Sequence, residues 1–392
     1  MPVAPPRPNN ILNGLQDPHP KSLKVMTDVH TLLGDVYSST ARAFLKVTNR
    51  PADSIHLITA RADSIPPSVA PHASLTQNNT QIEPAHHSWT AVVAAKTGVT
   101  TTTNLAVTRR PVDERDKSAG LPLESLFLQH PEKYRVCLHI GELMSLTIIP
   151  PKSANSGNPP PTSFCGPGTL FINYVMRYVS PVKKTDEDGT HSRKGKVYDV
   201  VVNEFLRHHD YSVQLPSLSI ATEMYGTHEV QDLLDDHYNE GKNEEDMVAT
   251  ITRITAENIL RHYNRLVALH CPQDRKIEEL FICGPGARNM SIVDYLENKL
   301  PKEVITRPVH DVGIPDNAME VLCCAQLGLE TILKHARDAD GPFERSQIGR
   351  TNGGAVKGQN WDNLREHIMR FSGGKTVYSA QNVVVHDDRP RR

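Results

Sequence analysis

The stretch from residue 243 to residue 332 alternates helical and extended patterns, and this alternation constrains the fold more than any other feature of the chain. Asn243 can cap a helix whose acidic start, 244–246, meets the positive end of the helix dipole, and apolar residues recur at helical spacing to Val267. The elements predicted after it are a strand at 279–283, a turn at 284–289, a helix through 292–300, a strand at 304–309 and a helix at 321–332. Strands that alternate with helices indicate a sheet covered by helices, so the chain is predicted to be an α/β protein.

The chain has 392 residues, enough for two domains that each bury a core. The N-terminal half carries one predicted helix and two predicted strands. The helix lies at 25–44, the strands at 97–107 and 134–151, and the polar loops at 59–90 and 150–163. The second loop is the first plausible seam between domains. The predicted division is therefore a flexible N-terminus (1–24), a first domain (25–160), a second domain (161–335) and an irregular C-terminal tail (336–392).

The composition argues against several classes of protein. A net charge of −2 leaves no electrostatic footprint for nucleic acid. No stretch approaches the roughly 18 apolar residues that span a bilayer, so no membrane partner is expected. The six cysteines form no CxxC pair, which is typical of a reduced, cytoplasmic protein. The 19 histidines have no spacing that fits a zinc site, so no metal ligands are predicted.

Two glycine-rich turns precede predicted helices and could receive a phosphate group. These are GPGARN at 284–289 and CGPGT at 165–169. Glycines let a ligand approach the backbone, and a helix N-terminus offers unpaired N–H groups. A dinucleotide fingerprint would need a third glycine where Asn289 stands, so a Rossmann site is disfavoured. The simpler alternative for GPGARN is a tight turn whose Asn caps the next helix.

The sequence around these turns and beyond them resembles the anhydro-N-acetylmuramic acid kinase family, and most closely its levoglucosan kinase branch. The strings that carry the resemblance are GPGTLFINYVMRY (166–178), DEDGTHSRKGKV (186–197), VATITRITAENI (248–259), LFICGPGARNMSIVDYLE (280–297) and GIPDNAMEVLCCA (313–325). The resemblance implies a two-lobed actin/hexokinase-like (ribonuclease-H-like) sugar kinase fold. It also implies Mg-ATP as cofactor, an anhydro sugar as substrate, transfer of phosphate to O6 as the sugar ring is opened, and a possible homodimer.

The same resemblance assigns a set of nucleotide-binding residues in the second lobe. They are Gly166, Gly168 and Thr169 of the inner turn, and Gly284, Gly286 and Asn289 of the adenosine-side turn. On the sugar side it points to Asp116 and Glu320. The alternative for Asp116 is an exposed charged loop, and the alternative for Glu320 is a solvated or capping acid near the start of the last predicted helix.

The sequence departs from the family pattern where the chemistry would occur. Nothing like the family's first phosphate loop, GTSxDG, occurs before Lys24, so the first lobe is expected to be incomplete. The family's second loop reads DTGPGN, and its general-base Asp falls near Phe164 and Cys165 here, so no catalytic residue is assigned. Further departures are Arg61 in the sugar-site segment, Glu142 in place of a Gly, and Leu218 and Thr222 where the family has cations.

Three functions remain open from the sequence. The first is a pseudokinase that keeps the fold, with nucleotide or sugar binding retained. The second is an active ATP-dependent kinase whose first loop is missing only because the gene model is incomplete, although the scattered replacements argue against this. The third is a non-kinase catalyst or accessory protein that reuses the cleft, with Cys165 as a conceivable nucleophile whose thiolate a helix dipole would favour.

Overall fold

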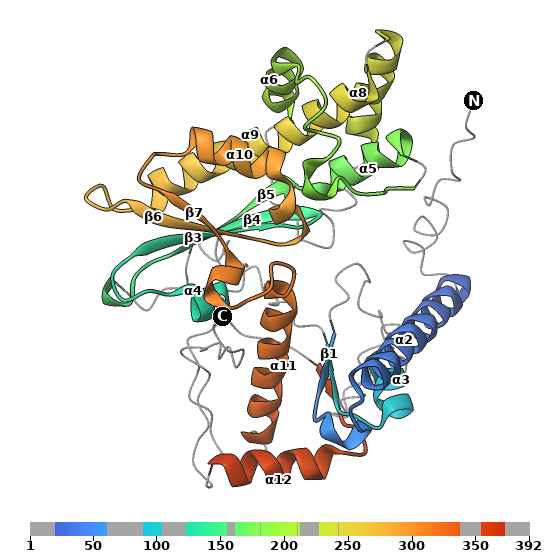
Figure 1. Ribbon diagram of the computed structural model, residues 1–392. Helices are drawn as coiled ribbons and strands as arrows, with labels where there is room; N and C mark the ends of the chain where they lie inside the picture. The colour runs from blue at the N-terminus through green and yellow to red at the C-terminus, as the bar shows by residue number, and fades with distance from the viewer. Residues whose placement is uncertain are drawn as a thin grey trace, which may run out of the picture. The chain divides into compact units, whose positions relative to one another are not determined.

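The protein is described by a computed structural model in which residues 20–60, 89–103, 123–154, 161–180, 182–209, 211, 227–241, 243–337 and 354–372 are placed. The chain divides into two compact units, which Figure 1 shows with their elements. Unit 1 comprises Met1–Ala106, Leu327–Glu344 and Thr351–Val377. Unit 2 comprises Val107–Gln326, Arg345–Arg350 and Tyr378–Arg392.

Unit 2 is built on a five-stranded mixed sheet with the order β5-β4-β3-β6-β7. The strands are β3 (Tyr134–Ile140), β4 (Leu143–Ile149), β5 (Thr162–Pro167), β6 (Ile277–Cys283) and β7 (Ile305–Pro308). The first three form an antiparallel meander. Strand β6 then pairs with β3 in parallel, and β7 pairs with β6 in parallel. The central strand β3 therefore has neighbours on both sides, which suits its run of β-branched and apolar residues.

Helices cover both faces of this sheet. Successive strand residues point to opposite faces, and buried residues of β3 lie on each of them. On one face Val136, Leu138 and Ile140 of β3 join a large core, whereas Cys137, between them, joins a smaller core on the other face. The helices of the larger core are α5 (Thr169–Val179), α6 (Asp199–His208), α8 (Thr227–Asn239), α9 (Glu244–His270) and α10 (Met290–Lys299). The smaller core is closed by α4 (Leu123–Leu128) and the first turns of α11 (Met319–Arg337).

Short 3-10 helices connect several of these elements. In unit 2 they are η3 (Lys152–Ala154), η4 (Glu187–Gly189), η5 (Pro285–Arg288) and η6 (Val309–Val312). The connection η5 links β6 to α10, and η6 follows β7 directly. Both therefore lie at the carboxyl end of a parallel strand.

Unit 1 contains a small three-stranded sheet and its own core. The strands are β1 (Ile58–Thr59), β2 (Thr101–Thr103) and β8 (Gly354–Val356), with β2 in the middle. The other elements are α2 (Pro20–Thr48), η1 (Ala52–Ser54), α3 (Trp89–Thr97), α12 (Trp361–Ser372) and the rest of α11. Helices α2 and α3 lie side by side (Figure 1), and the Tyr37 and Trp89 rings pack with centroids 4.8 Å apart.

The α/β class predicted from the sequence is confirmed, and so are the strongest individual elements. Asn243 caps α9 by accepting a hydrogen bond from the Glu245 N–H at 3.0 Å. The strand, turn and helix predicted at 279–300 correspond to β6, η5 and α10. The helix predicted at 25–44 is part of α2.

Three expectations differ from the structure. The single strand predicted at 134–151 is wrong, because the chain reverses at Gly141–Glu142 and forms the β3–β4 hairpin. The tail predicted to be irregular contains β8, which pairs with β2, and the helix α12. The contact boundary lies at Ala106/Val107 rather than after residue 160, because β3 and β4 pair with strands of the second half.

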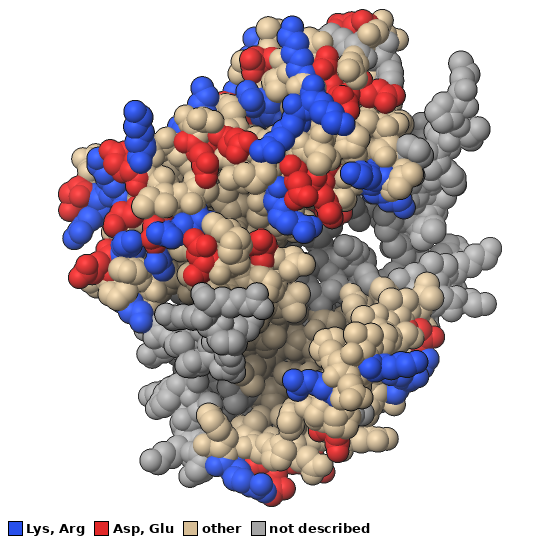
Figure 2. All heavy atoms as spheres, viewed as in Figure 1, with Lys and Arg blue, Asp and Glu red and all other residues tan. Residues whose placement is uncertain are grey.

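The surface of unit 2 carries both signs of charge close together. Figure 2 shows Lys and Arg side chains interspersed with Asp and Glu over its helices on the face in view. Ion pairs such as Lys194–Glu245 (3.4 Å) and Arg261–Glu257 (3.2 Å) account for part of this mixture. Among the placed residues, no helix is both long enough and apolar enough to cross a bilayer.

Candidate functional site

The glycine-rich turns meet at one edge of the unit 2 sheet. Strands β3 and β6 are parallel, and β5 runs in the same direction as β3 because two antiparallel steps separate them. The carboxyl ends of all three strands therefore lie at the same edge. In open α/β sheets, ligands bind outside this edge.

Both predicted turns pack against the end of β3. A Cβ on Gly284 would lie 2.7 Å from the Ile140 carbonyl oxygen, and one on Gly286 would lie 2.3 Å from Ile140 Cγ2. Gly284 also has a φ of +89°, which an L side chain rarely adopts. On the inner turn, a Cβ on Gly168 would lie 2.4 Å from the Gly141 carbonyl oxygen. The structure thus brings the two turns together, and close packing already explains why these glycines are needed.

The N–H groups that open α5 are engaged inside the protein. Gly168 donates to the Glu142 carbonyl at 2.7 Å, and Thr169 donates to the Gly141 carbonyl at 2.8 Å. The N–H of Leu170 also donates to Glu142, at 3.4 Å, and the Thr169 hydroxyl donates to Gly141, at 3.1 Å. A phosphate group at this helix start would have to displace the β3–β4 turn from these donors.

Asn289 acts as a structural cap in unit 2. Its side-chain oxygen accepts from the Ser291 N–H at 3.1 Å, and its amide donates to the Asp186 carbonyl at 3.1 Å. The Asp186 carboxylate in turn accepts from the N–H groups of His191 (2.8 Å) and Ser192 (3.1 Å). Asn289 and Asp186 are both 4% exposed. The capping alternative considered for GPGARN is therefore the one that its contacts support.

Phe164 and Cys165 stand where the resemblance places the family's general-base Asp. Phe164 lies within β5, opposite Ser145 of β4, and is half-buried. Cys165 is fully buried in the same strand, and its thiol donates to the Ser163 carbonyl at 3.6 Å. Burial raises the pKa of this thiol well above its usual range. The expectation that a helix dipole favours the Cys165 thiolate is wrong, because α5 begins only at Thr169.

The two predicted sugar-side residues have different outcomes. Asp116 lies outside the described residues. Glu320 is exposed and lies in the first turn of α11, where its negative charge suits the positive end of the helix dipole. This position agrees with the solvated-acid alternative, and contact with a sugar stays a prediction.

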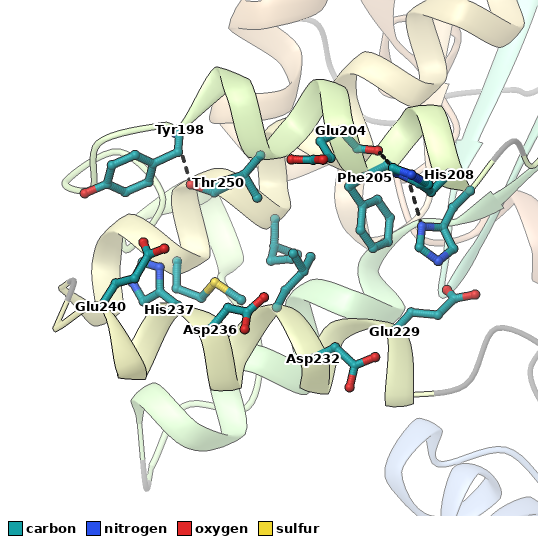
Figure 3. Close-up of a pocket in the computed structure, with 15 residues that line it drawn as sticks. Tyr198, Glu204, Phe205, His208, Glu229, Asp232, Asp236, His237, Glu240 and Thr250 are labelled. Carbon is teal, nitrogen blue, oxygen red and sulfur yellow. Dashed lines mark hydrogen bonds between the residues drawn. The ribbon is translucent and has the colours of Figure 1, made fainter.

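A separate pocket of about 430 Å³ lies among α6, α8 and α9. Figure 3 shows three of its carboxylates, Glu229, Asp232 and Asp236, along α8. Glu204 and Glu240 add two more, and no Lys or Arg belongs to its lining. Five carboxylates would repel a polyphosphate, so this pocket is unsuited to a nucleotide. This pocket could not be predicted from the sequence, because its residues come from three helices and their flanking residues, which only folding brings together.

The carboxyl edge of the sheet is where the resemblance would place Mg-ATP. The glycines leave room for close backbone approach, but the first N–H groups of α5 are engaged and Glu142 adds an exposed carboxylate at the adjoining turn. Among the placed residues, no group of three or more His, Cys, Asp or Glu side chains is arranged to hold a metal ion. The start of α5 therefore fits the phosphates of Mg-ATP poorly, whereas magnesium bound to a nucleotide needs only one or two protein carboxylates besides the phosphate oxygens.

A helix-covered mixed sheet with two glycine turns at its carboxyl edge, together with the family strings, defines a protein of the sugar kinase class. The family model for anhydro-N-acetylmuramic acid kinase matches residues 2–338. The chain belongs to this family, whose members have the actin/hexokinase-like fold.

Two curated relatives support the assignment. The anhydro-N-acetylmuramic acid kinase of Caldanaerobacter subterraneus subsp. tengcongensis is 26% identical over 81% of this chain and 78% of its own length. That of Cyanothece sp. is 30% identical over 61% of each chain. A solved structure, the activator of the 2-hydroxyisocaproyl-CoA dehydratase from Clostridium difficile with bound ADPNP, is 14% identical over 62% of this chain and 72% of its own, with a TM-score of 0.33. That score is too low to carry an argument.

Proposed function

We propose that this chain is an anhydro-sugar kinase homologue that has lost effective phosphoryl transfer and acts by binding an anhydro sugar or a nucleotide. The observation that carries the proposal is Phe164, which stands in β5 where the family loop supplies a carboxylate. A positioned general base contributes about 10²- to 10⁴-fold to a rate. An aromatic ring cannot accept the proton of the attacking group.

The surroundings of the α5 start support the same proposal. The donors that would neutralise phosphate charge bind the carbonyls of Gly141 and Glu142 instead. The Glu142 side chain is exposed at that turn, so a phosphate brought there would meet a like charge. Phosphoryl transfer depends almost wholly on positioning and charge neutralisation, and both are weakened here.

The active-kinase alternative is favoured by a different observation. The family glycines Gly166, Gly168, Gly284 and Gly286 are retained, and those of the two turns lie together at the end of β3. The curated relatives are named as kinases. For the non-kinase catalyst, by contrast, the buried Cys165 offers no support.

A rate assay separates the proposal from the active-kinase alternative. The purified full chain is incubated with Mg-ATP and either levoglucosan or 1,6-anhydro-N-acetylmuramic acid, and ADP release is followed beside the Caldanaerobacter relative. We expect turnover at least about 10²-fold below that of the relative, the lower bound for a lost general base. A comparable turnover would overturn the proposal.

A matched pair of variants tests the role of Phe164. Phe164→Asp supplies the missing carboxylate, and Phe164→Asn has the same shape without the charge. The Asp variant is expected to release ADP faster than the Asn variant and the native chain. Equal rates for the two variants would show that position 164 does not limit the reaction. Calorimetry with Mg-ADP on the same samples reports nucleotide binding independently of turnover.

The remaining parts of the assignment rest on the sequence. We propose levoglucosan-type sugars as the first ligands to test, the cytoplasm as the location and a homodimer as the assembly. Mg-ATP, the nucleotide that the resemblance implies, is expected to bind weakly, because the first N–H groups of α5 are engaged within the protein. None of the six cysteines forms a disulfide in the described structure, which agrees with a reducing compartment. Light scattering coupled to size-exclusion chromatography measures the mass of the assembly directly.

A further inference from the structure

A second pocket of unit 2, of about 300 Å³, lies between α9, α10 and the segment 192–197. Its walls are polar: Ser192 comes from the connecting segment, Thr252 and Arg253 from α9, and Ser291 and Asn298 from α10. None of these residues belongs to the two glycine turns or to the acidic pocket of Figure 3. The pocket is therefore separate from the sites described above.

Thr252 is the residue of this pocket whose buried hydroxyl needs an explanation. It is 1% exposed, and its hydroxyl oxygen has no hydrogen-bond partner in the described protein. Most buried polar groups in native proteins are hydrogen-bonded, so an unpartnered hydroxyl on a residue that lines a pocket points to a partner from outside the described protein, reached once a ligand displaces the atoms that cover it. The neighbouring hydroxyls of Ser192 and Ser291 lie 2.8 Å apart and add further donors and acceptors.

The charged residues that line this pocket indicate an anionic ligand. Arg193 and Arg253 contribute two guanidinium groups, whereas Asp294 is the one carboxylate among the lining residues. Arg193 pairs with Asp294 at 2.9 Å, but both side chains are about half exposed, so this pair is weak. Arg253 stacks on the Tyr295 ring, with 4.1 Å between guanidinium carbon and ring centroid, which orients its planar donor fork. Its Nη1 also lies 3.5 Å from Asp199, but that carboxylate is 74% exposed, so this pair is weak as well.

We propose that this pocket binds a small phosphorylated sugar or polyol. The guanidinium groups would take the phosphate, because Arg donors match phosphate oxygens in bidentate geometry. The hydroxyls of Thr252, Ser192 and Ser291 would bind the hydroxyl groups of the ligand. This inference goes beyond the proposed function, because it concerns a pocket that contains none of the predicted nucleotide or anhydro-sugar residues.

Isothermal titration of the full chain tests the proposal with three probes: glucose 6-phosphate, glucose and inorganic phosphate. Glucose 6-phosphate is expected to bind most tightly, since only it engages both the guanidinium groups and the hydroxyls. Failure of glucose 6-phosphate to bind overturns the proposal, and glucose binding as tightly as glucose 6-phosphate overturns the role of the charges. Added Mg-ATP is expected to leave binding unchanged, and competition would show that the probe occupies the nucleotide site instead.

Variants assign the binding to this pocket. Thr252→Val keeps the side-chain shape and removes one neutral hydrogen bond, so glucose 6-phosphate should bind about 2- to 10-fold more weakly. The melting temperature should not fall, because a buried unpaired hydroxyl is removed. Arg253→Met should weaken binding about 10- to 100-fold through loss of a charge-assisted bond. Arg207→Gln, a matched loss of charge outside the pocket, should have no effect. Binding that is unchanged in both pocket variants overturns the assignment.

Discussion

Glu279 is a buried carboxylate on β6 that interacts with three cations. Its side chain is 4% exposed, and it accepts hydrogen bonds from Lys133 Nζ at 2.9 Å and Arg135 Nε at 2.7 Å. Arg307 Nε lies 3.2 Å from the same carboxylate. The cations come from the approach to β3, from β3 and from β7, so one side chain links three parts of the sheet region.

Replacing Glu279 by Gln tests this link. The variant weakens the hydrogen bonds to three cations, of which Lys133 and Arg307 are about one-third exposed and can be hydrated instead. We expect the free energy of unfolding, measured by urea denaturation of the full chain, to fall by about 1.5–3 kcal/mol, the range for hydrogen bonds to charged groups. Glu303→Gln is the matched control, because Glu303 pairs with Lys276 at the exposed surface and its loss should not measurably change stability. Equal effects of the two substitutions on the free energy of unfolding would contradict the role of Glu279 as a link between parts of the sheet region.

The same carboxylate predicts a pH dependence. Burial by itself raises the pKa of Glu279, but the hydrogen bond from Lys133 and the charge and hydrogen bond of Arg135 outweigh it, so the pKa is lowered. A lowered pKa means that the unfolded state binds the proton more readily. The stabilisation is therefore complete above the unfolded pKa of about 4.3 and is lost as the pH falls through the folded value. The stability difference between the native chain and Glu279→Gln should shrink below about pH 4.3. A difference that stays constant to pH 3 would contradict this.

The start of α10 is held in place by Asn289, which joins the helix to the segment that contains η4. Asn289→Ala removes the cap of the Ser291 N–H and the hydrogen bond to Asp186. Loss of a cap costs about 0.5–2 kcal/mol, so we expect the midpoint of denaturation to fall accordingly. Asn203→Ala, on the exposed face of α6, should leave the midpoint nearly unchanged. A fall of equal size in both variants would argue against a capping role.

The elements that sequence predicted best are those whose signals are local. Asn243 with its acidic neighbours gave the start of α9, and the glycines before Asn289 gave the turn into α10. The β3–β4 hairpin was missed because Gly141–Glu142 interrupts an otherwise continuous apolar stretch without a strong turn signal. The strand β8 was missed because its pairing with β2 joins residues more than 250 positions apart.

The candidate site likewise combines features that local sequence patterns predict with features that depend on long-range contacts. The sequence identified the two glycine turns, because glycine before a helix is a local pattern. It could not show that the Gly168 and Thr169 N–H groups bind the β3–β4 turn, since that contact depends on how β5 pairs with β4. The orphan hydroxyl of Thr252 was likewise hidden, because the pocket forms only where α9 meets α10 and the segment 192–197.

At the scale of the whole molecule, each unit has its own hydrophobic core. Unit 1 is centred on Trp89 and Val93, and unit 2 on the residues around β3. The two tryptophans of the chain, Trp89 and Trp361, both belong to unit 1. Tryptophan fluorescence therefore reports on unit 1, whereas far-ultraviolet circular dichroism reports on the helices of both units.

Separate cores predict separable unfolding transitions. Glu279→Gln should lower the midpoint seen by circular dichroism and leave the fluorescence midpoint unchanged. Val93→Ala, which removes a fully buried side chain from unit 1, should lower the fluorescence midpoint instead. If Glu279→Gln shifts both midpoints equally, the chain unfolds as one cooperative body. In that case α11, which runs from residue 319 in unit 2 to residue 337 in unit 1, is the helix among the described residues that can couple the two units through the chain.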